Sequence, residues 1–280
     1  MGFAKYMEDD LSRYHGRTVV REREHERFRP NAGPEQGNEH INRHGKMIMS
    51  EHKPSRRMKD FTLAQPKPLP VIVLADASGS MSENGKIEAL NQALKDMIHT
   101  FATESRVKAE IQVGLIIFGG TDARIHLPLA PAHQIVNVTP IRAEGATPMG
   151  QAFDLARDLL ENRDLIPARA YRPALILVSD GLPTDDWERP FKALQASERA
   201  QKTSRFAMSI GDDADDEMLA QFGNDREAHV FKAHEARDIH RFFRAVTMSV
   251  TSRTVSANPD QPEGLDLAEI PGDEGLDLDF

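Results

Sequence analysis

Cysteine is absent from the 280 residues, which excludes disulfide bonds, thiolate nucleophiles and zinc sites built on cysteine. Long apolar runs are also missing, because none approaches the roughly 18 residues of a membrane span. The opening MGFAKYMEDD lacks the apolar core of a signal peptide. We therefore expect a cytoplasmic protein that does not associate with membranes.

An excess of basic residues is missing as well. The formal net charge is -9, and the residues after Arg253 carry eight Asp and Glu and no Lys or Arg. The body of the chain is therefore close to neutral. A nucleic-acid-binding domain would show a basic face, so we expect nucleic acid not to be a partner.

Composition divides the chain into three parts. Residues 1–66 are rich in Arg, Glu, His and Gly with little apolar periodicity, which is typical of a flexible charged arm. Residues 67–254 contain the apolar, periodic segments and are predicted to form one domain. Residues 255–280 are predicted to be an acidic flexible tail.

Within the central part, continuous apolar strands alternate with amphipathic helices. This alternation predicts a doubly wound, mostly parallel α/β sheet with helices on both faces. We predict that Thr147 is the N-cap of its helix and Pro148 its first residue. The expected strands are 70–76, 110–120, 123–131, 171–181, 205–211 and 229–233, and the expected helices are 87–101, 147–162, 191–202, 217–222 and 236–252.

Side chains with oxygen donors follow the strands of this predicted sheet. In sheets of this class, ligands bind beyond the carboxyl ends of the strands. A set of neutral hydroxyls and two carboxylates suits a hard cation such as Mg2+, and the ion would remain able to accept a carboxylate from a protein partner. The predicted metal residues are Asp76, Ser78, Ser80, Thr147 and Asp180.

Other interpretations of the same residues are weaker. Taken singly, Asp76 could cap a turn, Ser78 and Ser80 could be ordinary loop hydroxyls, Thr147 could be a helix N-cap and Asp180 could begin a turn. A phosphate-binding loop needs four residues between its glycine and Gly-Lys, whereas five separate Gly79 from Gly85, and Ile87 follows Lys86 where Ser or Thr is required. No His is placed by sequence beside either serine, so a nucleophilic triad has no base. We therefore expect a protein that is not an enzyme.

The motifs DASGS, GATPMG and SDGLPTDDW resemble the metal-ion-dependent adhesion site, MIDAS, of von Willebrand factor type A domains. The resemblance implies a six-stranded sheet with one antiparallel edge strand and a site for Mg2+, Mn2+ or Ca2+. It also implies that Ser78, Ser80 and Thr147 contact the ion directly or nearly so, whereas Asp76 and Asp180 act largely through water.

SDGLPTDDWE, SIGDDADDEMLAQF and DIHRFFRAVTMSVTSR are similar to the bacterial tellurite-resistance, TerY-like subgroup. That resemblance implies a protein-interaction module of a stress-response or phage-defence system, alongside a PPM-type phosphatase and a serine/threonine kinase. The alternative is a regulatory subunit of an AAA+ ATPase complex, because some type A domains accompany such motors.

Two further segments are candidates for partner binding. Asp185, Asp186 and Trp187 follow the predicted metal site, and Trp187 is either a partner anchor or a helix-start residue packed on the core. In the tail, EGLDL occurs at 263–267 and again at 274–278. Leu265 and Leu276 between carboxylates suit an apolar groove with a basic rim, although a disordered tail with chance repetition remains the alternative.

Overall fold

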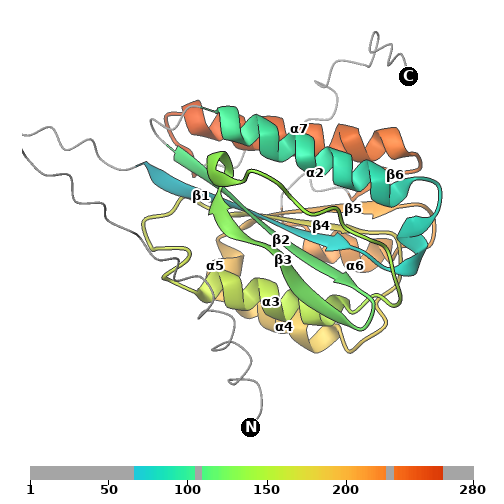
Figure 1. The fold of residues 1–280 in the computed structure, drawn as a ribbon. Coiled ribbons are helices and arrows are strands. Elements are labelled where there is room, and N and C mark those ends of the chain that lie inside the picture. The colour runs from blue at the N-terminus through green and yellow to red at the C-terminus, as the bar shows by residue number, and fades with distance from the viewer. Residues whose placement is uncertain (1–65, 105–108, 225–229, 261–280) are drawn as a thin grey trace, which may run out of the picture. The chain divides into compact units, whose positions relative to one another are not determined.

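The computed structural model describes residues 66–104, 109–224 and 230–260, all of which lie in the unit Thr62–Phe280. A six-stranded sheet with strand order β3-β2-β1-β4-β5-β6 forms its centre (Figure 1). Neighbouring strands are parallel except for β3, which pairs antiparallel with β2 at one edge. The predicted fold class is confirmed. The strands are β1 (Lys67–Asp76), β2 (Ala109–Gly119), β3 (Asp122–Pro131), β4 (Ala174–Ser179), β5 (Ser204–Ile210) and β6 (Phe231–Ala233).

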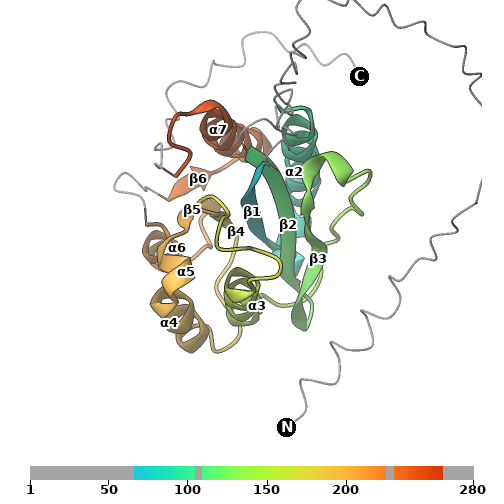
Figure 2. The ribbon, with the colours of Figure 1, turned by 90° about the vertical axis from the view of Figure 1, so that its left-hand side faces the viewer.

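Helices cover both faces of the sheet (Figure 2). One face carries α2 (Lys86–Thr103) and α7 (Ala236–Val255). The other carries α3 (Met149–Glu161), α4 (Glu188–Ala196), α5 (Glu198–Gln201) and α6 (Asp216–Phe222). Two short 3-10 helices, η2 (Gly79–Ser82) and η3 (Ala132–Gln134), complete the described elements. Among the helices that the structure describes, none is long and apolar enough to cross a membrane.

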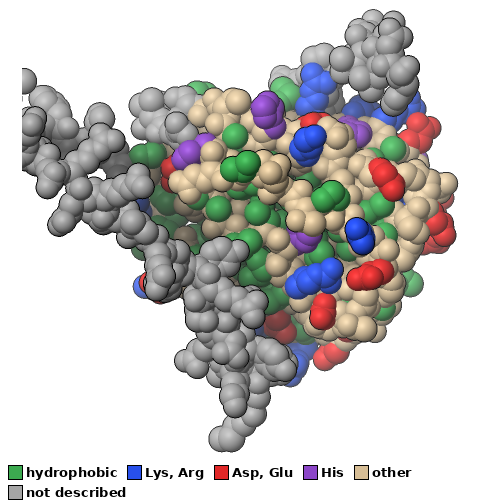
Figure 3. Space-filling view, viewed as in Figure 1, with side chains coloured by type: hydrophobic (Ala, Val, Ile, Leu, Met, Phe, Trp, Pro, Cys, Tyr) green, Lys and Arg blue, Asp and Glu red, His purple; other side chains and the backbone are tan. Residues whose placement is uncertain are grey.

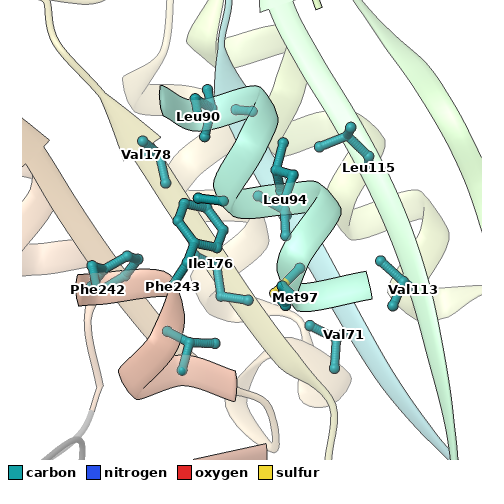
Figure 4. Packing of buried hydrophobic residues seen from close by; sticks show 14 of the residues in the cluster. Val71, Leu90, Leu94, Met97, Val113, Leu115, Ile176, Val178, Phe242 and Phe243 are labelled. Carbon is teal, nitrogen blue, oxygen red and sulfur yellow. The ribbon is translucent and has the colours of Figure 1, made fainter. Parts of the chain in front are cut away.

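The sheet separates two hydrophobic cores, and β1 supplies side chains to both. Val71, Val73 and Ala75 face the α2 and α7 side, whereas Ile72 and Leu74 face the other. Side chains alternate along a strand, so a strand covered on both faces needs an uninterrupted apolar run. Figure 4 shows the first core, where side chains of α2 and α7 meet those of the strands.

Several predicted helix boundaries differ from the structure, and α7, for example, ends at Val255 rather than at residue 252. α3 begins at Met149 with Pro148 as its N-cap, one residue later than expected, and Thr147 does not cap it. The helix expected over 191–202 begins earlier, at Glu188, and is broken at Ser197. Ser197 has an extended backbone (φ -63, ψ 127), and its hydroxyl accepts a hydrogen bond from the Ala200 N–H at 3.3 Å. It therefore caps α5 as a separate helix.

Some predictions concern segments outside the described residues. These are the arm up to residue 65 and the tail from residue 261, which includes Leu265 and Leu276. Within the tail as predicted, the structure describes residues 255–260, where α7 ends at Val255 and a short segment continues to Asp260.

Candidate metal site

Three loops converge at the carboxyl ends of β1 and β4. These strands are parallel neighbours, with Ala75 opposite Val178, so Asp76 and Asp180 leave the sheet at the same edge. The Gly79 N–H donates to the Gly145 carbonyl at 3.0 Å, which holds the loop before α3 against the loop after β1. Residues separated by 100 positions in the sequence are thereby brought together.

Asp76 is fully buried at the centre of this region. Its Oδ1 accepts from the Ser78 N–H at 2.8 Å, and its Oδ2 accepts from the Ser179 hydroxyl at 2.5 Å. Burial raises the pKa of Asp76 to about 6. The hydrogen bonds from Ser179 and Ser78 act in the opposite direction, and the charge of Asp180 adds a smaller increase.

Hydrogen bonds connect the two serines to the second carboxylate. The Oγ atoms of Ser78 and Ser80 are 3.1 Å apart, and the Ser80 hydroxyl donates to Asp180 Oδ1 at 2.7 Å. Ser78 is 2% exposed, whereas Ser80 lies at the solvent-facing rim. This arrangement places one hydroxyl inside the site and one at its opening.

Thr147 borders the same region from the loop before α3. Its N–H donates to the Thr184 hydroxyl, and its carbonyl accepts from the Thr184 N–H, both at 3.0 Å. Its hydroxyl oxygen lies 3.8 Å from the point that a Cβ on Gly181 would occupy. The structure therefore brings all five predicted metal residues to one edge of the sheet.

The donor chemistry of this cluster fits a hard divalent cation. Its side chains offer oxygen atoms alone, which suit Mg2+, Mn2+ or Ca2+ better than zinc or copper. Across the described ranges, no group of three or more His, Asp and Glu side chains is placed to hold a metal. Hydroxyl groups would therefore have to complete any coordination shell here.

A sequence model of the von Willebrand factor type A domain matches residues 71–245. The chain belongs to this family. No curated protein matches the sequence. Solved structures do match it, and the chain spans less than half the length of each of the following three.

Three solved structures illustrate the likeness. A von Willebrand factor type A protein from Catenulispora acidiphila has 22% identity and a TM-score of 0.52, over 66% of this chain and 42% of that one. The proximal thread matrix protein 1 of the mussel byssus, solved with a zinc-occupied MIDAS motif, has 16% identity and a TM-score of 0.52, over 67% and 48%. The pilus adhesin SpaC from Lactobacillus rhamnosus GG has 15% identity and a TM-score of 0.53, over 67% and 31%. At these identities the likeness shows the fold.

Sequence reasoning did not identify two residues of this type A domain's site. Lys86, the first residue of α2, places its Nζ 2.7 Å from Asp180 Oδ2, with side-chain exposures of 17% and 0% respectively. Ser179 holds Asp76 from the adjacent strand. The serine immediately before Asp180 could have been identified from the sequence. The contact of Lys86 with Asp180 could not, because it depends on the direction in which α2 leaves the preceding loop.

The three residues proposed for partner contact occupy different environments. Asp185 accepts hydrogen bonds from the Gly150 N–H at 2.9 Å and the Gln151 N–H at 3.1 Å, so it caps α3. Asp186 is exposed. Trp187 is half-buried against the second core, with its ring centroid 5.8 Å from that of Phe191. All three line a surface groove of ≈ 600 Å³.

Proposed function

We propose that this type A domain is a Mg2+-dependent protein-interaction module. The main support for the proposal is the convergence of three hydroxyls and two carboxylates at the carboxyl ends of β1 and β4, where the Ser80 hydroxyl donates a hydrogen bond to Asp180. The residues that would hold the ion are Asp76, Ser78, Ser80, Thr147 and Asp180. Mn2+ or Ca2+ would fit the same oxygen donors.

The bound ion would supply an electrophilic centre for a carboxylate of the partner. Asp76 and Asp180 contribute two negative charges, and Lys86 contributes one positive charge at 2.7 Å from Asp180. Adding a divalent ion to these three side chains would give the site a net charge of +1. A partner carboxylate would therefore complete both the charge balance and the coordination shell.

The chain's own hydrogen bonds orient this site. The Ser78 N–H and the Ser179 hydroxyl hold both oxygens of Asp76 in place, which leaves that carboxylate to act through water. Ser78 and Ser80 would contact the ion through their hydroxyls. Leu182, which is 61% exposed two residues after Asp180, offers an apolar contact at the rim.

We also propose that the protein is not an enzyme. A serine nucleophile needs a neighbouring base that takes its proton. In the described part of the chain, the hydrogen-bond partners of the Ser80 hydroxyl are the Ser78 hydroxyl and the Asp180 carboxylate, and Lys86 already holds the other oxygen of Asp180. This pairing suits a binding site better than nucleophilic catalysis.

For the biological setting, we propose a cytoplasmic role in a bacterial stress-response, tellurite-resistance-like or phage-defence system. The similarity of SDGLPTDDWE and DIHRFFRAVTMSVTSR to the TerY-like subgroup supports this setting. The proposed partners are a PPM-type phosphatase and a serine/threonine kinase.

Calorimetric titration of the full chain with Mg2+ tests the metal site. We expect Ser78→Ala to weaken Mg2+ binding by at least tenfold, which corresponds to about 1.4 kcal/mol. Ser82→Ala is the matched control, because Ser82 is exposed in the same turn and its hydroxyl donates a hydrogen bond to the Gly79 carbonyl rather than to a residue of the metal site. Absence of Mg2+, Mn2+ and Ca2+ binding by the unmodified chain would refute the site.

Capture from bacterial lysate tests the interaction. Immobilised full chain is presented with Mg2+ or with EDTA, beside the Ser78→Ala and Ser82→Ala variants. We expect partners that require both the metal and Ser78. Recovery of an AAA+ ATPase in that fraction would favour the alternative partner class, and capture that ignores both EDTA and Ser78→Ala would contradict a metal-dependent interaction.

A further inference from the structure

A pocket of ≈ 590 Å³ lies where β4 begins, at the opposite end of that strand from the metal site. Ile166, Pro167 and Tyr171 are among the residues that form its apolar wall. Charged side chains of both signs are interspersed on the face of the molecule seen in Figure 3. The lining of this pocket also carries both signs, but its four basic residues outnumber the acidic Glu198 and Asp260 around an apolar surface.

The arginines of this pocket form no ion pair with a carboxylate within the described residues. Arg163, Arg172 and Arg199 line it. The acidic Glu198 pairs with Lys202, whose Nζ is 2.5 Å from its carboxylate, and the pKa of Glu198 is lowered mainly by Lys202 and further by the charges of Arg163 and Arg199. The excess positive charge at the pocket is therefore carried largely by guanidinium groups, which bind carboxylates in a bidentate manner.

A buried donor of a residue that lines the pocket lacks an acceptor. The Nε of Arg172 is buried without a hydrogen-bond partner, as are the Nε and Nη1 of Arg205, which does not itself line the pocket. Burial lowers the pKa of Arg205, and the positive charge of Arg172 lowers it further, so the two guanidinium groups are close enough to repel each other. An anion bound in the pocket near Arg172 would offset the repulsion between the two guanidinium groups.

The chain itself passes along the pocket wall before its acidic segment. Arg253 donates from Nε to the Pro259 carbonyl at 2.7 Å and from Nη2 to the Arg172 carbonyl at 2.6 Å. The Arg172 N–H donates to Asp260 Oδ1 at 2.7 Å, and Asp260 lines the pocket. Residue 261 therefore follows directly from the pocket wall.

We propose that the first EGLDL copy, residues 263–267, docks in this pocket. Residues 261–280 contain seven Asp and Glu and no Lys or Arg, which complements the arginines. The leucines of EGLDL match the apolar wall. The copy begins three residues after Asp260, a span of about 10 Å at most. This short tether gives it a high effective concentration at the pocket.

The second copy, residues 274–278, has the same sequence on a longer tether and serves as an internal control. The proposal does not rest on the proposed metal-dependent function, because the pocket and the metal site lie at opposite ends of β4. Removing the metal with EDTA should therefore abolish the metal-dependent interaction and leave the docking of EGLDL in the pocket unchanged.

Fluorescence polarisation with a labelled peptide of residues 261–270 tests the docking. The peptide is titrated into the full chain, whose own copy competes with it. We expect the double variant Leu265→Ala, Leu267→Ala to bind the peptide about tenfold more tightly than the unmodified chain, because its competing copy is weakened. The matched variant Leu276→Ala, Leu278→Ala should behave like the unmodified chain. Equal peptide affinity for all three chains, or no binding to any, would overturn the proposal.

The pocket is tested in the background of Leu265→Ala, Leu267→Ala. Arg163→Glu should weaken peptide binding about tenfold, and because Arg163 is exposed the variant should fold normally. Arg244→Glu, which reverses an exposed charge on α7, should have no effect. A scrambled peptide of the same composition should bind weakly. Loss of binding with EDTA or Ser78→Ala would place the acidic segment at the metal site and overturn the assignment to this pocket.

Discussion

Burial governs the chemistry of Asp76, whose side chain has no contact with solvent and whose pKa rises from 3.8 to about 6. Burial disfavours the charged carboxylate more than the hydrogen bonds from Ser179 and Ser78 favour it. Lys86 acts differently, because its ammonium group compensates the buried charge of Asp180 directly. Burial therefore dominates the electrostatics of Asp76, whereas the ion pair with Lys86 stabilises the charge of Asp180.

The raised pKa of Asp76 predicts a pH dependence of stability in the presence of EDTA. Between about pH 4 and pH 6 the folded chain binds this proton and the unfolded chain does not, so the free energy of unfolding falls as the pH rises through this range. The expected contribution is roughly 3 kcal/mol at most. Urea unfolding of the unmodified chain and Asp76→Asn, compared at pH 4.5 and pH 7, measures it. A difference between the two proteins that is independent of pH would contradict the prediction.

Removal of the Lys86 charge should strengthen metal binding. Lys86→Met leaves Asp180 available to the ion and removes a repulsive positive charge from the site, so we expect Mg2+ to bind about tenfold more tightly. The buried carboxylate also loses its partner, so the variant should be less stable in EDTA. Calorimetry and urea unfolding check both effects. Lys95→Met, an exposed lysine of the same helix, is the control, and unchanged Mg2+ affinity in Lys86→Met would count against the argument.

At the scale of elements, the start of α3 depends on a residue far along the chain. Pro148 at the N-cap has no side-chain hydrogen bond, and the carboxylate of Asp185 accepts from the Gly150 and Gln151 N–H groups instead. A Cβ on Gly150 would lie 2.6 Å from the Asp186 carbonyl oxygen, so only glycine permits this approach. The loop after β4 is thereby fastened to the loop that carries Thr147.

Asp185→Ala should therefore destabilise the fold by about 1–2 kcal/mol, as loss of a helix cap does. Asp186→Ala, at the neighbouring exposed position, should change the free energy of unfolding by no more than about 0.5 kcal/mol. Denaturant unfolding of both variants measures the difference. Equal stability of the two variants would argue that Asp185 does not act as a cap.

At the scale of the whole molecule, the two hydrophobic cores support a rigid edge of the sheet where the metal residues meet. An ion that binds the folded chain alone stabilises it by an amount that grows with the ratio of the ion concentration to its dissociation constant. The site and the global fold are thus thermodynamically linked, although the ion would contact loops.

We expect Mg2+ at a hundred times its dissociation constant to raise the free energy of unfolding by about 2.7 kcal/mol. At the same Mg2+ concentration the increase should fall to about 1.4 kcal/mol or less in Ser78→Ala, whose binding is weakened at least tenfold, and persist in Ser82→Ala. Urea midpoints with and without Mg2+ provide the measurement. A full increase in Ser78→Ala would show that the ion binds elsewhere.

Local patterns were sufficient to predict the mostly parallel sheet and the position of most helices, whereas the antiparallel edge strand was implied by the family resemblance. Apolar runs as long as β1 are stable when covered on both faces, and D-x-S-x-S places Asp76 at the end of the strand with Ser78 and Ser80 in the turn that follows. The convergence of Asp180 with them followed from the rule that parallel strands share their carboxyl edge, whereas the loop of Thr147 is held there by hydrogen bonds of Gly145 with Gly79 and of Thr147 with Thr184. These predictions needed no knowledge of side-chain contacts.

Tertiary structure decided the contacts that join distant segments. Lys86 and Asp180 are separated by 94 positions, Asp76 and Ser179 by 103, and no local pattern specifies which side chains meet across such distances. The helix boundary at Met149 differed from the prediction because Asp185, 35 positions beyond Gly150, supplies the cap that was assigned to Thr147. Periodicity reports which face of an element is buried, whereas hydrogen bonds and ion pairs between elements depend on packing that forms only in the folded chain.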